Sequence, residues 1–427
     1  MPEVAIIGLG PVGLATALGL AQNGHQVTGV DVDKARIGKL LRAESPVYEV
    51  GMEEELNRAL SRKRFLPTPD ITDTSPKTEF FFLCVGTPSR ADGSMDDYPI
   101  AKATEEVAKV LPPDQRPIVV VKSTVVPGTT ELIIIPILEA SGKPFGVAVN
   151  PEFLREGHAL EDTLRPDRIA MGFAEEETGR RLRTLYESHT CPKVETNLRT
   201  AEAIKHVSNA FLATKVGFAN EMANLCQRLG VSYDEVMKGV ILDDRINPKF
   251  LVPGVGFGGS CFPNDLQALV AAGRGAGYAP PLLEAVIRHN ERQHLEALRL
   301  LEEELGSLPG RRIAILGLAF KGDTDDVRES RALLLARDLQ DRGANVVGFD
   351  PVASRKFRQL MPDVHLAGSV AEALAGAEGC IVQAEWQEFQ ELGAEDFLKS
   401  MRTPVVVDGR RILDPERMEG VRFRRIG

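Results

Sequence analysis

The start of the chain places the strongest constraint on its fold. An apolar run at 4–7 leads into GLGPVG, a helix-like segment follows, and a second apolar run at 26–30 ends on Asp31. Strand, glycine turn, helix, strand and acid in this order form the dinucleotide fingerprint of a Rossmann domain. The glycines admit a pyrophosphate to the helix N-terminus, while the acid binds ribose hydroxyls and disfavours NADP. The pattern predicts NAD at Gly8, Gly10, Gly13 and Asp31. An ordinary tight glycine turn, the alternative, leaves Asp31 unexplained.

Further apolar runs lie at 80–85, 118–121 and 147–149, and each ends in small or polar residues. Fully apolar strands separated by helical segments are typical of a parallel sheet that is covered on both faces. Ligands of such sheets bind at the carboxyl ends of the strands, where these polar residues would lie. We therefore expect a doubly wound α/β domain with its site at that edge.

The last part of the chain repeats the first. Runs at 313–319 and 345–350 resemble the two that flank the first glycine turn, but GLAFKG replaces GLGPVG. A second Rossmann-like domain that holds a different ligand is therefore expected. Lys321 and Arg410 could supply positive charge for a phosphate there, unless they are ordinary surface cations.

Apolar residues at helical spacing predict a helix over about 200–229 and another over 280–305. The first is long for a globular protein, so we expect it to span between domains or to form a subunit interface. The fold predicted is two Rossmann-like doubly wound parallel-sheet domains joined by a long central helix and a helical dimerisation region. The expected domains are 1–198, 199–305 and 306–427.

Composition excludes several classes of function. The 427 residues carry a net charge of −10, which argues against nucleic acid or an anionic membrane as the main partner. The five cysteines are scattered singly, so neither a disulfide framework nor a metal site is expected. An apolar strand pattern begins at once and leaves no room for a signal peptide. A cytoplasmic protein is the expectation.

The segment GVGFGGSCFPND at 254–265 carries the chemistry that is most specific to this chain. Glycine lets backbone N–H groups approach a bound molecule closely, and a thiol exposed in such a loop can attack a carbonyl. Asp265, four residues after Cys261, can handle the proton of the thiol or of water. The simpler explanation is a glycine-rich surface turn with an inert cysteine.

Two more pairs of polar residues share a helical spacing of four. Lys205 and Asn209 would lie on one helix face, where an ammonium and an amide can stabilise a developing alkoxide. Glu152 and Glu156 follow a strand, so one could act as a base or bind sugar hydroxyls. A solvated helix face and an acidic first helical turn are the respective alternatives.

Taken together, these segments resemble the family of NAD-dependent nucleotide-sugar 6-dehydrogenases over nearly the full length. The motifs that carry the resemblance are GLGPVG at 8–13, VGTP at 85–88, KSTVVPGT at 122–129, NPEFLREG at 150–157, IKHVSNAFLATK at 204–215, GVGFGGSCFPND at 254–265, FKGDTDDVRES at 320–330 and DGRRILD at 408–414.

The resemblance implies a four-electron oxidation of the C6 alcohol of UDP-glucose to a carboxylate, with two NAD used in succession. Cys261 would attack the aldehyde to form a thiohemiacetal, which becomes a thioester and is then hydrolysed. Lys205 and Asn209 would hold the C6 oxygen, while Asp265 would assist the thiol or the water. Thr124 and Glu152 would position a water or the sugar, and no metal takes part.

The resemblance also implies binding residues. At the cofactor they are Gly8, Gly10, Val12, Gly13, Asp31, Arg36, Thr87, Thr124, Glu156 and Arg328. At the nucleotide sugar they are Glu152, Phe153, Leu154, Lys205, Asn209, Phe250, Leu251, Gly258, Lys321 and Arg410, together with Arg245, which would reach the site of the neighbouring subunit in a homodimer.

The chain departs from the family at position 264, where Asn replaces the usual Lys. Cofactor affinity or rate would suffer if that Lys contacts the cofactor or tunes the thiolate. Three other functions stay open: the same chemistry on GDP-mannose, a two-electron hydroxy-acid dehydrogenase, and a scaffold that senses NAD without catalysis. The second leaves Cys261 idle, and the third predicts decayed catalytic positions, yet Lys205, Asn209, Cys261 and Asp265 are all present.

Overall fold

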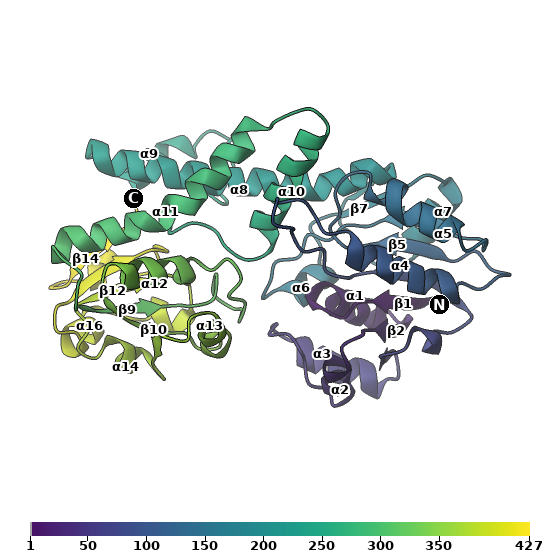
Figure 1. Ribbon diagram of the computed structural model, residues 1–427, viewed down its shortest axis with the longest axis horizontal. Helices are drawn as coiled ribbons and strands as arrows, with labels where there is room; N and C mark the ends of the chain where they lie inside the picture. The colour runs from purple at the N-terminus through teal and green to yellow at the C-terminus, as the bar shows by residue number, and fades with distance from the viewer. Residues whose placement is uncertain (1) are drawn as a thin grey trace. The chain divides into compact units, whose positions relative to one another are not determined.

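The computed structural model describes residues 2–427, which form two compact units (Figure 1). The first unit holds the residues up to 208 and residues 267–276, and the second holds 209–266 and 277–427. The chain passes from one unit to the other inside α8 (Leu198–Leu229), inside α10 (Cys261–Gly275) and just after α10. The helix expected over 200–229 is confirmed, whereas the three predicted domains stay a prediction.

The first unit is built on an eight-stranded sheet in the order β3-β2-β1-β4-β5-β6-β7-β8. All neighbouring strands are parallel except β6 and β7, which run antiparallel. The strands are β1 (Glu3–Ile7), β2 (Gln26–Val30), β3 (Phe65–Thr68), β4 (Thr78–Leu83), β5 (Ile118–Val121), β6 (Gly146–Val149), β7 (Ile169–Phe173) and β8 (Lys193–Thr196).

The antiparallel step corrects the expectation of a purely parallel sheet. Because β7 runs opposite to β6, the connection at 150–168 need not cross the sheet and stays at the carboxyl end of β6. This connection contains the NPEFLREG segment. The reversal therefore keeps the two glutamates of that segment at the edge where ligands of parallel sheets bind.

Helices cover both faces of this sheet. Along β1, Val4 and Ile6 pack with Leu14 of α1, whereas Ala5 and Ile7 pack in a separate cluster with Ile100 of α4. This alternation confirms a doubly wound domain. The helical segments are α1 (Pro11–Gln22), α2 (Lys34–Leu41), α3 (Met52–Ser61), η1 (Ile71–Asp73), α4 (Tyr98–Val110), η2 (Thr130–Ile134), α5 (Ile135–Glu139), α6 (Ala159–Leu164) and α7 (Glu176–Thr184).

The second unit repeats this design with a six-stranded, fully parallel sheet in the order β11-β10-β9-β12-β13-β14. Helices α11 and α14 pack on opposite faces of it (Figure 1). The strands are β9 (Arg312–Leu316), β10 (Asn345–Phe349), β11 (His365–Leu366), β12 (Gly379–Val382), β13 (Val405–Asp408) and β14 (Arg422–Arg425).

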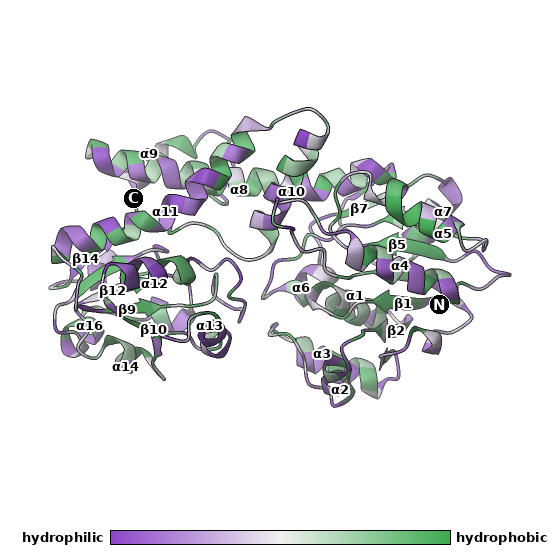
Figure 2. Ribbon diagram, viewed as in Figure 1, coloured by the Kyte–Doolittle hydropathy of each residue, from purple (hydrophilic) through white to green (hydrophobic). Residues whose placement is uncertain are grey.

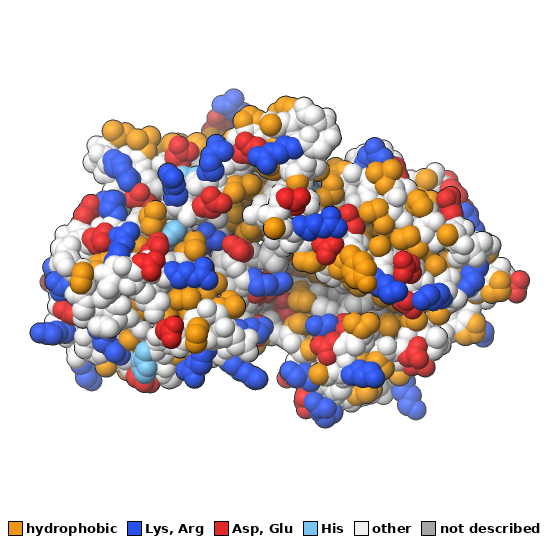
Figure 3. Space-filling view, in the orientation of Figure 1, with side chains coloured by type: hydrophobic (Ala, Val, Ile, Leu, Met, Phe, Trp, Pro, Cys, Tyr) orange, Lys and Arg blue, Asp and Glu red, His pale blue; other side chains and the backbone are white. Residues whose placement is uncertain are grey.

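The helical segments of the second unit, besides its parts of α8 and α10, are α9 (Tyr233–Val240), α11 (Pro281–Leu305), α12 (Arg331–Asp341), α13 (Ser354–Leu360), α14 (Val370–Leu374), α15 (Gln387–Gln390), α16 (Ala394–Ser400) and η3 (Pro415–Arg417). In Figure 2 the central strands of both sheets are green for hydrophobic, as expected of strands buried on both faces. Acidic and basic side chains are interspersed over the face in Figure 3. Among residues 2–427, no helix is long and apolar enough to cross a membrane.

The acids at the ends of β2 and β10 occupy equivalent places but have different partners. Asp350, after β10, is buried and accepts hydrogen bonds from the backbone of Leu318, Ala319, Val352 and Ala353, and one from the indole of Trp386. The hydrogen bonds of its carboxylate therefore stabilise the turn after β9. The second unit thus lacks a free acid where a dinucleotide site would need one.

Candidate functional site

The glycine turn between β1 and α1 is shaped for a phosphate. Gly8 has φ +96°, and a Cβ there would lie 2.7 Å from the carbonyl oxygen of Cys84. A Cβ on Gly13 would lie 1.8 Å from the carbonyl oxygen of Gly8, so only glycine lets the helix begin this close to the strand. A Cβ on Gly10 would meet nothing within 4 Å, and no side chain caps α1. The N-terminus of α1 therefore has no side-chain cap and has open space at Gly10, which suits a pyrophosphate.

Asp31 at the end of β2 is buried and lies next to this turn. One of its oxygens, Oδ2, accepts hydrogen bonds from the backbone N–H of Leu9 at 2.8 Å and from Arg36 at 2.6 Å. The other accepts from the backbone of Asp33. A carboxylate has about four lone-pair positions, so capacity remains for ribose hydroxyls. The structure thus brings Gly8, Asp31 and Arg36 together, as an NAD site requires.

The ends of β4 and β5 bring two of the predicted threonines together. The hydroxyl of Thr87 donates a hydrogen bond to the backbone carbonyl of Thr124 at 2.7 Å. Both residues follow strands that pair directly with each other. They therefore lie side by side at the carboxyl edge of the first sheet.

Glu152 and Lys205 form a buried ion pair in the first unit. Lys205 Nζ lies 2.8 Å from Glu152 Oε1, and the two side chains are only 4% and 7% exposed. The other oxygen of Glu152 accepts from the backbone N–H of Leu154. This contact joins α8 to the connection after β6. Removing one partner from such a pair leaves an uncompensated charge and costs about 3–5 kcal/mol.

The neighbouring Lys122 was not singled out by the sequence analysis. Its ammonium donates to the backbone and side-chain carbonyl oxygens of Asn150, and the same amide oxygen accepts from the hydroxyl of Tyr186. Burial lowers the pKa of Lys122, and burial raises the pKa of Cys84 to about 12. Cys84 is thus an inert thiol at neutral pH. Lysine at the polar end of an apolar strand was the available sequence signal.

In the second unit, Cys261 is an exposed thiol at the first position of α10. Asp265 follows one helical turn later and is buried, and its Oδ2 accepts a hydrogen bond from Asn209 Nδ2 at 2.5 Å. Asn209 in turn lies one helical turn beyond Lys205 on α8. The exposed thiol, the buried carboxylate and the amide therefore lie on two helices that contact each other, an arrangement suited to nucleophilic addition with proton handling.

The predicted nucleotide-sugar loop is also in the second unit. Phe250 has φ +65° and is half exposed, while Leu251 and Gly258 are buried. Arg410 does not point its donors into solvent: its guanidinium bonds the backbone carbonyls of Gly256, Phe320 and Gln383. Arg410 thereby holds the loop as well as placing a positive charge beside it.

The remaining predicted residues have local partners. Arg245 is 84% exposed and pairs with Asp243 in its own loop. Arg328 pairs with Asp326, and Lys321 lies over the ring of Phe320. In the first unit, Phe153 stacks under Arg168 with 3.7 Å between the guanidinium carbon and the ring centroid, Leu154 packs on the core, and Glu156 is partly buried.

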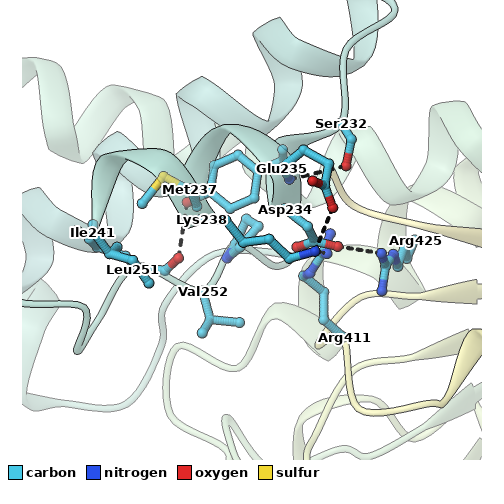
Figure 4. Close-up of a pocket in the computed structure, with 12 residues that line it drawn as sticks. Ser232, Asp234, Glu235, Met237, Lys238, Ile241, Leu251, Val252, Arg411 and Arg425 are labelled. Atoms are coloured by element: carbon cyan, nitrogen blue, oxygen red, sulfur yellow. Dashed lines mark hydrogen bonds and ion pairs between the residues drawn. The ribbon is translucent and has the colours of Figure 1, made fainter.

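A separate pocket of about 490 Å³ lies between α9, residues 251–253 and the side chains of Arg411 and Arg425 (Figure 4). Both arginines bond Asp234, and Lys238 bonds Glu235. Three cations and two carboxylates therefore line this pocket and pair with one another, and of the predicted site residues only Leu251 lines it. Within residues 2–427, no group of three His, Cys, Asp or Glu side chains is arranged to hold a metal ion.

Comparison with known proteins gives consistent matches. The UDP-glucose/GDP-mannose dehydrogenase family models match residues 2–190 as the NAD binding domain, 199–292 as the central domain and 314–415 as the UDP binding domain. The UDP-glucose 6-dehydrogenase AglM of Haloferax volcanii is 43% identical, with 99% of each chain covered.

Two solved structures are similar to this chain over its full length. A UDP-glucose dehydrogenase from Pyrobaculum islandicum is 41% identical with a TM-score of 0.93, covering 99% of this chain and 97% of that one. A GDP-mannose dehydrogenase from Pseudomonas aeruginosa is 30% identical with a TM-score of 0.56, covering 100% of both chains.

The geometry of Asp31 predicts how cofactor choice is set. Replacing Asp31 with Ala removes the ribose acceptor and frees Arg36 for the extra phosphate of NADP. We expect the KM for NAD to rise about tenfold and NADP to become a usable cofactor, measured by steady-state kinetics with each. Asp33→Ala is the matched control: it removes the cap of α2 and should leave the preference for NAD intact. An unchanged NAD to NADP ratio in Asp31→Ala would contradict this assignment.

Proposed function

Since the chain belongs to the UDP-glucose/GDP-mannose dehydrogenase family, we propose that it oxidises the C6 alcohol of UDP-glucose to the carboxylate of UDP-glucuronate. The observation that carries the chemistry is the exposed thiol of Cys261 one helical turn from the buried Asp265–Asn209 pair. The choice of UDP-glucose is supported by the full-length likeness to UDP-glucose dehydrogenases, which exceeds the likeness to the GDP-mannose enzyme.

The first unit supplies the NAD site. Gly8, Gly10, Val12 and Gly13 shape the turn for the pyrophosphate, and Asp31 and Arg36 receive the adenosine ribose. Thr87, Thr124 and Glu156 complete the cofactor contacts proposed for this unit, and Arg328 of the second unit is assigned to the cofactor as well. NAD held there would supply the hydride acceptor for the oxidation of the alcohol and for that of the thiohemiacetal.

The protein's own residues make the second oxidation productive. The Cys261 thiolate adds to the C6 aldehyde to give a thiohemiacetal, and the thioester that follows is hydrolysed by water to the acid and the free thiol. Lys205 and Asn209 stabilise the negative charge that develops on the C6 oxygen. Asp265 takes the proton of the thiol or of the attacking water, which Thr124 and Glu152 orient.

Substrate recognition is assigned to two sets of residues. Glu152, Phe153 and Leu154 contact the sugar from the connection after β6. The loop with Phe250, Leu251 and Gly258, together with Lys321 and Arg410, holds the nucleotide. The three predicted domains, 1–198, 199–305 and 306–427, follow the family matches closely and form part of this proposal. A cytoplasmic location stays a prediction.

Counting NADH tests the function directly. We expect two NADH per UDP-glucose consumed, because the alcohol is carried through the aldehyde to the acid. GDP-mannose and UDP-N-acetylglucosamine, assayed side by side, should give far lower rates. One NADH per substrate would point to a two-electron dehydrogenase, faster turnover of GDP-mannose would reassign the substrate, and no NADH with any of them would point to a scaffold.

Replacing the nucleophile tests the thioester route. Cys261→Ser should lower the rate of UDP-glucuronate formation by at least about a thousandfold, because the thiolate that captures the aldehyde is lost. The measurement is the acid released, quantified by chromatography. Cys191→Ser, a partly buried cysteine packed on the core of the first unit, should leave this rate unchanged. Undiminished acid output from Cys261→Ser would reject the route.

The proposed homodimer is supported by an apolar stripe on α8. Phe211, Phe218, Leu225 and Leu229 recur at spacings of seven and four, so they share one helix face, and they are 45–67% exposed. Isolated chains rarely leave such a stripe in water. A second copy of the chain would cover it, and the exposed Arg245 would then reach the partner's substrate.

A shared site predicts complementation between two inactive variants. Arg245→Ala and Cys261→Ser should each be nearly inactive alone. Co-expressed, they should recover roughly a quarter of wild-type activity, because half of the randomly formed dimers carry one intact site. Two copies of Cys261→Ser differing only in their affinity tags serve as the control. Absence of recovery in a purified mixed dimer would show that Arg245 acts within its own subunit.

A further inference from the structure

The glycine loop before Cys261 is held by buried side-chain amides. Asn290 of α11 accepts a hydrogen bond from the backbone N–H of Phe257 at 2.8 Å and donates one to the carbonyl of Phe257 at 3.0 Å. A single amide therefore pairs with both polar groups of one residue, as a neighbouring β-strand would. Asn290 is only 5% exposed, so water does not readily replace it.

Two further amides hold the start of the same loop. The backbone N–H of Gly254 donates to Asn220 at 2.8 Å, and the carbonyl of Gly254 accepts from Gln293 at 2.9 Å. Asn220 and Gln293 are almost fully buried. Gln293 lies one turn after Asn290 on α11, so one face of this helix contacts the loop both at Gly254 and at Phe257.

Polar groups also approach the glycines of the loop closely. A Cβ on Gly256 would lie 2.8 Å from the side-chain oxygen of Asn290, and one on Gly258 would lie 2.3 Å from the backbone oxygen of Glu329. Arg410 bonds the carbonyl of Gly256. The loop backbone is thus packed closely against its polar partners.

The contacts that hold the loop also reach the start of α10, where Cys261 lies. The ring of Phe257 packs edge to face on Phe262, with 5.6 Å between the centroids, and Phe262 directly follows Cys261 in the first turn of α10. Fixing the backbone of Phe257 therefore also fixes the side chain against which the start of α10 rests.

We propose that Asn290 is a positioning residue that holds residues 254–259 and the start of α10 in the conformation that binds the nucleotide sugar. This inference rests on the proposed function for its ligand. Asn290 itself touches no reacting atom. Its effect passes through Phe257 to the loop and to Cys261, so its loss should weaken substrate binding without touching the cofactor site of the first unit.

Kinetics of the full-length protein test the proposal. Asn290→Ala leaves both polar groups of Phe257 without their partner, and Asn290→Asp keeps the acceptor but sets a carboxylate against the Phe257 carbonyl. Each should raise the KM for UDP-glucose about tenfold or more while the KM for NAD stays within twofold of wild type. Hydrogen exchange should become faster in 254–259 and stay unchanged in the first unit.

The matched control is His294→Ala, on the same helix. His294 is equally buried, but its ring pairs with Asp338 of α12 instead of the loop. This variant should lower the melting temperature and keep the wild-type KM for UDP-glucose. An Asn290→Ala protein that is folded and has a KM within twofold of wild type would overturn the proposal, as would an equal rise in KM for His294→Ala.

Failure of the proposed function gives a different result. If the wild-type protein forms no NADH with UDP-glucose, the assigned substrate is wrong. Hydrogen exchange then tests the positioning role of Asn290 independently of the substrate. Faster exchange confined to 254–259 in Asn290→Ala supports this role, and unchanged exchange there overturns it.

Discussion

The buried ion pair between Lys205 and Glu152 is the contact on which the site depends. It fixes α8 to the carboxyl edge of the first sheet, and neither charge can be removed alone without a cost of about 3–5 kcal/mol. One turn further along the same helix, Asn209 bonds Asp265 of α10. Lys205 and Asn209 are thus each held by a buried carboxylate of their own unit. The roles proposed for both groups gain from this, because a side chain that is fixed before substrate arrives needs no further ordering.

The two halves of the chain show how one design can serve two ligands. At the end of β2, Asp31 accepts hydrogen bonds from Leu9 and Arg36 and has lone-pair positions left for a ligand. At the end of β10, Asp350 accepts from four backbone N–H groups and an indole. The same residue type at the same place therefore keeps acceptor positions for a ligand in one unit and closes a turn in the other. Sequence likeness between the halves does not reveal this difference, because it depends on neighbouring backbone groups.

The sequence predicted the central strands and the long helices, since apolar runs and helical spacing record burial directly. It missed β8 and β14, which are polar edge strands with the sequences KVET and RFRR, β3, which contains Pro67, the two-residue β11, and β7. The antiparallel direction of β7 was not predicted either, because direction depends on how the connection at 150–168 folds. The pairing of Glu152 with Lys205 joins residues far apart in the chain, and spacing alone cannot show it. The contacts of Asn290 and Gln293 with the glycine loop could not be predicted for the same reason.

Uncharged amides suit the glycine loop for an electrostatic reason. A nucleotide sugar carries phosphates, so carboxylates in place of these amides would repel it. An additional buried cation would lower stability, because removing its charge from water is unfavourable. Asn290, Asn220 and Gln293 satisfy the backbone without adding charge. Arg331, a buried cation beside the loop, bonds the backbone carbonyls of Asn290 and Glu329. Lys321 and Arg410 are the cations assigned to the nucleotide, and Arg410 is itself oriented by three backbone carbonyls. Neutral side chains can thus fix the shape of the loop while cations at its border select the charge of the ligand.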